Sequence, residues 1–126
     1  MSRRPRIRSI KPEAWQDERI AGLSRDGRLL WVVLVTMADD EGRFRVVPSL
    51  ILAHGYLYDR DAARRLNSWL QELSTSGLVA LYEVGDHAFG VFPKWKLNQR
   101  ISKPSKSVLP APPSSILVAE PDERAA

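Results

Sequence analysis

One apolar run constrains the fold of this chain more than any other segment: Leu29-Leu30-Trp31-Val32-Val33-Leu34-Val35. Its β-branched residues would also suit a buried strand. The segment, however, extends from Ser24, a good helix N-cap, to about Asp39, which is too long for a usual strand. We therefore predict a helix over residues 24–39. Because this helix is apolar on every side, it must be covered on several sides, and we expect it at the centre of the fold.

The remaining segments predict a small mixed domain. A short helix begins at Pro12, with Trp15, Ile20 and Leu23 on its buried side. A strand over 43–46, a helix over 48–55, a helix from Asp59 or Asp61 to about Ser76 and a hairpin follow. The hairpin pairs 78–84 with 87–92 around a turn at Gly85-Asp86. The predicted class is mostly α with a small antiparallel β-hairpin (α+β): a winged helix-turn-helix with an extra N-terminal helix. A small α+β domain that uses the hairpin as a partner-binding edge is the alternative.

Length and composition exclude several classes of protein. The 126 residues fit one domain, and the absence of cysteine excludes disulfides and thiolate metal sites. No apolar stretch approaches the roughly 20 residues that span a bilayer, and no apolar segment follows the basic N-terminus as in a signal peptide. We therefore expect a cytoplasmic protein. No phosphate-binding loop, nucleophile elbow or metal-ligand spacing occurs, so we expect no enzyme, cofactor or metal.

The charges of the chain are sorted into blocks. Residues 1–12 and 94–106 each carry five basic residues and no acidic one, whereas residues 13–93 have a net charge of −4. This pattern predicts a basic flexible arm over 1–11, a folded domain over 12–95, a second basic arm over 96–106 and a Pro-rich, acidic, disordered tail over 107–126. Two acid-free arms beside an acidic body indicate a polyanionic partner, although basic ends can also serve solubility alone.

The predicted helix that ends near Ser76 has two unlike faces. Its apolar stripe is Ala62, Ala63, Leu66, Trp69, Leu70 and Leu73. Its opposite stripe holds no acid, with Glu72 at the margin, and its side chains are of the kinds that pair with base edges and phosphates. A plain solvent-facing stripe is the alternative, but such stripes usually mix both signs of charge.

The two arms would hold the DNA backbone, and the first arm would enter an A·T-rich minor groove. The expected DNA contacts are Arg3, Arg4, Arg6, Arg8 and Lys11 in the first arm, Arg60, Arg64, Asn67, Ser68, Gln71 and Thr75 along the helix, and Lys94, Lys96, Arg100, Lys103 and Lys106 near the second arm.

Two further features admit more than one interpretation. The acidic cluster Asp39-Asp40-Glu41 follows a helix end, where negative charge is unfavourable, so it is expected to pair with Arg43, Arg45 or the basic arms. Trp95 lies among lysines and could stack on a base, but packing against the body is the favoured interpretation.

Three segments resemble a known family: 6–15 (RIRSIKPEAW), 38–43 (ADDEGR) and 98–105 (NQRISKPS). They are similar to the winged-helix domain of phage and prophage replication-initiation proteins, of the replisome-organiser, DnaD-like kind. The resemblance covers roughly residues 6–110. It implies double-stranded DNA binding, at a phage origin or in transcriptional regulation, self-association and a bacterial host cytoplasm.

The rival prediction is a protein-interaction module. In that case the folded domain is a dimer or replication-partner platform, and Ile116-Leu117-Val118 in the tail docks on a partner as a linear motif.

Overall fold

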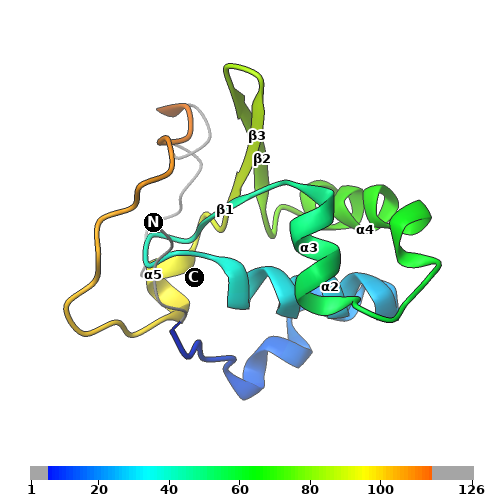
Figure 1. The fold of residues 1–126 in the computed structure, drawn as a ribbon. Helices are drawn as coiled ribbons and strands as arrows, with labels where there is room; N and C mark the ends of the chain where they lie inside the picture. The colour runs from blue at the N-terminus through cyan, green and yellow to red at the C-terminus, as the bar shows by residue number, and fades with distance from the viewer. Residues whose placement is uncertain (1–5, 115–126) are drawn as a thin grey trace.

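Helix α2 (Arg25–Met37) lies at the centre of the computed structural model, which describes residues 6–114 (Figure 1). Leu30 and Leu34 are completely buried, and the Ser24 hydroxyl accepts a hydrogen bond from the Gly27 N–H, as expected for the N-cap. The prediction of a central helix is confirmed. The helix is not covered on every side, however, because Leu29 is 43% exposed.

Two further helices pack on α2. They are α3 (Pro48–Gly55) and α4 (Ala62–Ser76), which also contact each other. Helix α4 ends at Gly77, whose φ of 83° is the left-handed conformation that the sequence predicts for a glycine there. Its buried stripe is confirmed except for Ala63, which is exposed.

The N-terminal region forms two short helical turns rather than one helix. They are the 3-10 turn η1 (Pro12–Gln16) and α1 (Glu18–Ala21), separated by Asp17, which caps α1. Ile20 and Leu23 are buried as predicted. The prediction for Trp15 is wrong, because the residue is 50% exposed, although its ring meets that of Trp31 edge-on.

The strands form one antiparallel sheet in the order β1-β3-β2, made of β1 (Arg43–Arg45), β2 (Ala80–Val84) and β3 (His87–Val91). The predicted hairpin and its Gly85-Asp86 turn are confirmed, with slightly shorter strands. Phe44 pairs with Gly90, and its ring lies where a Cβ on Gly90 would stand. The chain is therefore α+β, with five α-helices and three strands among residues 6–114.

The chain on both sides of this body is packed against it, where the sequence predicts free arms. Residues 6–11 bond to the segment after β3, which contains the unpredicted helix α5 (Trp95–Asn98). Further on, the Tyr82 hydroxyl donates to the Pro110 carbonyl, Arg43 donates to the Leu109 carbonyl, and Leu109 packs on Tyr82 and Phe89. Residues 107–112 thus cover the outer face of the sheet instead of forming a disordered tail.

No helix within residues 6–114 is long and apolar enough to cross a membrane. The tail motif 116–118 and the first-arm residues Arg3 and Arg4 lie outside the described residues.

Candidate nucleic-acid interface

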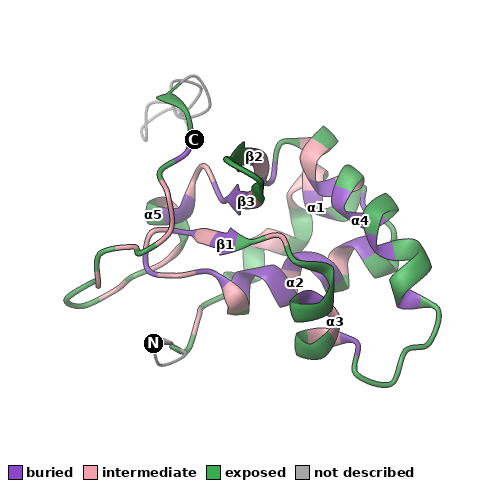
Figure 2. Cartoon of the chain, turned by 45° about the horizontal axis from the view of Figure 1, so that its top comes forward, coloured by how far each residue is buried: buried purple, intermediate pink, exposed green. Residues whose placement is uncertain are grey.

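Helix α4 presents one polar face to solvent. Its other face is buried against α2 and α3, and Figure 2 shows buried and exposed residues along it. The polar residues predicted to read DNA on or beside this helix are all exposed. Within residues 6–114, their side chains make no hydrogen bond or ion pair. The set is Arg60, Arg64, Asn67, Ser68, Gln71 and Thr75.

The acid at the margin of this face is already bound. The Glu72 carboxylate accepts hydrogen bonds from the Ser24 N–H at 2.8 Å and from the Ser24 hydroxyl at 2.7 Å. Glu72 thereby stabilises the N-terminus of α2, where negative charge is favourable. Its charge is directed at α2 and leaves the polar face of α4 without an acid.

One basic residue of α4 was missed by the sequence analysis. Arg65 is exposed, and its guanidinium carbon lies 6.0 Å from the centre of the Trp69 ring. The spacing of Arg65 and Trp69 in the sequence could have indicated this contact, because an Arg four residues before a Trp on a helix can lie over the ring.

Within the described part of the first basic arm, Arg6 and Lys11 are exposed as predicted, whereas the Arg8 side chain is withdrawn from solvent. The Arg8 side chain is only 5% exposed. Its guanidinium lies 3.0 Å from an Asp40 oxygen, donates to the Ala38 carbonyl and stands 5.1 Å from the centre of the Trp95 ring. The prediction that Arg8 lies in a free arm is therefore wrong, and its predicted contact with DNA remains a prediction. Arg6 also pairs with Asp40, at 3.2 Å, and Lys11 donates to the Leu97 carbonyl, so both are partly engaged within the chain.

Two arginines of the first arm pair with the acidic cluster Asp39-Asp40-Glu41. Asp40 is buried and binds Arg6, Arg8 and the Ser105 N–H. Burial alone would raise the pKa of Asp40, but the Ser105 hydrogen bond and the two guanidinium groups outweigh it and lower the pKa. The expectation that the cluster pairs with the basic arms and Arg43 is confirmed, since Glu41 also lies 3.4 Å from Arg43.

Trp95 packs in the body, as the sequence favoured. Its ring is buried against Phe92, and its indole N–H donates to the Asp40 carbonyl at 3.0 Å. Base stacking by Trp95 is excluded by this burial.

The three segments that carry the family resemblance meet at one place in space, which we call the terminal clasp: Arg6, Arg8, Asp40, Gln99 and Ser105. In addition to the Asp40 contacts, the Gln99 amide accepts from the Ser9 N–H and donates to the Ser9 carbonyl. These segments therefore contact one another through Asp40 and Gln99.

The second basic segment is available for binding. Lys94 is half-buried, whereas Lys96, Arg100, Lys103 and Lys106 are exposed. Figures 1 and 2 both show α5 and α4 at opposite ends of the body, with the sheet between them. The structure therefore does not bring the two predicted DNA-contacting sets together into one patch.

Comparison with protein-family models, with curated proteins and with solved structures finds no match to this chain. No group of three or more potential metal ligands is gathered among residues 6–114.

Proposed function

We propose that this chain is a winged helix-turn-helix protein that binds double-stranded DNA through α4. The observation that carries the proposal is the polar face of α4, which is exposed, acid-free and unpaired within the described residues. Arg64, Asn67, Ser68 and Gln71 are the residues proposed to face base edges in the major groove, where such side chains distinguish base pairs.

The arrangement of elements supports this proposal. A winged helix-turn-helix has a helix, a short strand, two helices and a hairpin in that order, and α2, β1, α3, α4 and β2–β3 follow it. The short strand β1 joins the second strand of the hairpin, and the hairpin extends away from the helices as a wing would (Figure 1). The turn at its tip carries Asp86 rather than a cation, so it is a poor phosphate ligand.

The exposed lysines and arginine near α5 are proposed to contact phosphates beyond the site that α4 reads. If about five cations in total touch phosphates, log affinity should fall with log salt at a slope of about −4 to −5. Because Arg8 is buried, the first arm contributes less to this slope than its charge alone predicts.

The biological role proposed from the family resemblance is replication initiation or transcriptional regulation in a phage or prophage. It is the role of a binding protein, with no catalytic step and no cofactor.

The test compares two pairs of variants on a preferred site and on random DNA. Arg64→Ala and Gln71→Ala should weaken the preferred site by roughly tenfold to a hundredfold while changing random DNA less. Lys103→Ala and Arg4→Ala should weaken both DNAs about equally. If both pairs of variants lost affinity equally for the preferred site and for random DNA, α4 would not read the DNA sequence.

A second candidate function is a protein-interaction platform. Large apolar side chains lie exposed on α3 and on the loop before α4: Leu50 is 46%, Leu57 69% and Tyr58 90% exposed. A dimer or partner interface would cover them. Under this proposal Tyr58→Ser changes the oligomeric state in sedimentation without changing DNA affinity.

A further inference from the structure

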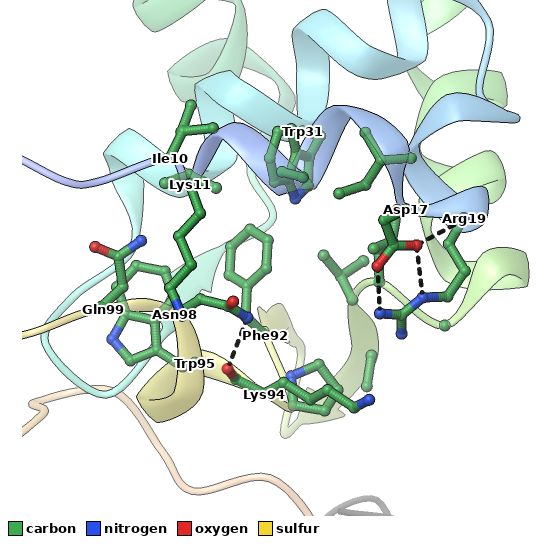
Figure 3. Close-up of a pocket in the computed structure, with 18 of the residues that line it drawn as sticks. Ile10, Lys11, Asp17, Arg19, Trp31, Phe92, Lys94, Trp95, Asn98 and Gln99 are labelled. Carbon is green, nitrogen blue, oxygen red and sulfur yellow. Dashed lines mark hydrogen bonds and ion pairs between the residues drawn. The ribbon is translucent and has the colours of Figure 1, made fainter. Parts of the chain in front are cut away.

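A pocket of about 630 Å³ lies where the N-terminal segment, α2, β2 and α5 meet (Figure 3). This volume is in the range of small-molecule sites in proteins. None of the α4 residues proposed to face DNA lines it, so it is separate from the proposed reading face.

The inner wall of the pocket is apolar. It includes the buried side chains of Trp31, Val35, Val79 and Phe92, with half-buried Leu81 beside them. Ala14 of η1 also lines the pocket, and its small side chain leaves space that a larger residue would fill. Such a wall favours an apolar body over a fully polar ligand.

The rim of the pocket has a small excess of positive charge, with Lys11, Arg19 and Lys94 against Glu13 and Asp17. Its acid Asp17 is bound by Arg19, with guanidinium contacts of 2.9 and 3.2 Å. In contrast, neither Lys11 nor Lys94 pairs with a carboxylate in the described part of the chain, and Glu13, the other acid of the rim, pairs with no cation there. Lys11 donates to the neutral Leu97 carbonyl.

Lys94 is the cation best placed to bind a ligand. It lines the pocket beside the apolar wall and is half-buried as a residue, and no carboxylate of the described residues pairs with its ammonium group. A carboxylate bound there would form charge-assisted hydrogen bonds while its apolar body fills the pocket.

We propose that this pocket binds a small amphipathic carboxylate, with the apolar body against Trp31 and Phe92 and the carboxylate at Lys94. The proposal does not rest on DNA binding, although Lys11 and Lys94 are also among the predicted DNA contacts, and its test uses no DNA.

The experiment titrates the full chain with decanoate and with decanol, its neutral counterpart, and follows the tryptophan indole N–H signals by NMR. Trp31 and Trp95 line the pocket, whereas Trp69 packs against Tyr56 outside it and serves as an internal control. Decanoate should shift the Trp31 and Trp95 signals, leave Trp69 unchanged and bind about tenfold more tightly than decanol.

Two variants locate the head and the body of the ligand. Lys94→Met should reduce decanoate affinity to that of decanol, whereas Lys103→Met, an equal loss of charge away from the pocket, should not. Ala14→Phe should weaken both probes by filling the pocket.

Any one of the following results would overturn the proposal: no shift at Trp31 with either probe, equal affinity for decanoate and decanol, or an equal loss in the Lys94 and Lys103 variants. A shift of Trp69 equal to that of Trp31 would also contradict it, because it indicates a general change of the fold.

Discussion

Asp40 holds the two ends of the domain to the body. Its side chain is 4% exposed and binds Arg8, which is 5% exposed. Removing one partner of a buried ion pair leaves the other charge uncompensated, at a cost of about 3 kcal/mol. Asp40→Asn should therefore lower the free energy of unfolding by about this amount in urea denaturation at neutral pH. Asp86→Asn, at the exposed hairpin turn, is the control and should have little effect.

The same pair gives a prediction about pH. Because the pKa of Asp40 is lowered in the folded state, its contribution is fully present above the ordinary aspartate pKa of 3.8 and is lost as the pH falls through the lowered value. The stability difference between the wild type and Asp40→Asn should shrink as the pH is taken from neutrality to below that range. A constant difference would show that the Asp40 charge is not the cause.

Tyr56 is a residue whose polar atom opposes folding. Its hydroxyl is buried without a hydrogen-bond partner in the described chain. Burial and the nearby charges of Asp26 and Asp59 raise its pKa from 10.0 to about 12. Tyr56→Phe should raise the free energy of unfolding by about 1 kcal/mol in urea denaturation.

The advantage of the Tyr56→Phe variant should grow as the pH rises from 10 toward 12, because the unfolded tyrosine ionises before the folded one does. A clear loss of stability at neutral pH would instead indicate that the hydroxyl has a bound partner.

At the scale of elements, Glu72 links α4 to the start of α2. Glu72→Ala removes two hydrogen bonds to Ser24 and should lower the thermal midpoint, at a cost of about 1 kcal/mol. Glu83→Ala, on the exposed side of β2, removes the same charge without those bonds and should leave the midpoint nearly unchanged. Equal effects of the two substitutions would mean that the loss of negative charge, and not the loss of the Glu72–Ser24 hydrogen bonds, lowers the thermal midpoint.

Most elements could be predicted from local signals. Ser24 as N-cap, Gly77 after α4 and Gly85-Asp86 between the hairpin strands each act through their immediate neighbours, and each is found where predicted. Helix α5 was missed because its single turn lies within a run of lysines and has no side-chain cap. Trp15 was misplaced because helical spacing cannot reveal that η1 and α1 are separated at Asp17.

At the scale of the molecule, the prediction of free flanking segments is wrong for residues 6–11 and 107–112, which pack against the body. The charges of these segments predicted exposure to solvent. The residues that pair with them, such as Asp40 for Arg8, lie far away in sequence. Local pattern does not reveal such contacts. The polar face of α4 could be predicted because helical periodicity alone sorts its residues, and its exposure agrees with that prediction.

The segment 107–114 should contribute to stability although it has almost no regular structure. It covers Tyr82 and Phe89 on the outer face of the sheet. A chain ending at Lys106 should have a lower free energy of unfolding than one ending at Ser114, by about 1–3 kcal/mol, because it loses apolar burial and hydrogen bonds. Its thermal midpoint should therefore be lower. Identical thermal midpoints by circular dichroism would show that this covering adds nothing.

The proposed DNA binding is tested most directly by fluorescence anisotropy of the full chain with phage-genome fragments and random duplex DNA, at about 50 and 200 mM salt. We expect tight, salt-sensitive binding, with a preference for particular fragments that is reduced by Arg64→Ala. Absence of binding at the lower salt would contradict it, and the exposed face of α4 would then have to be explained by a protein partner.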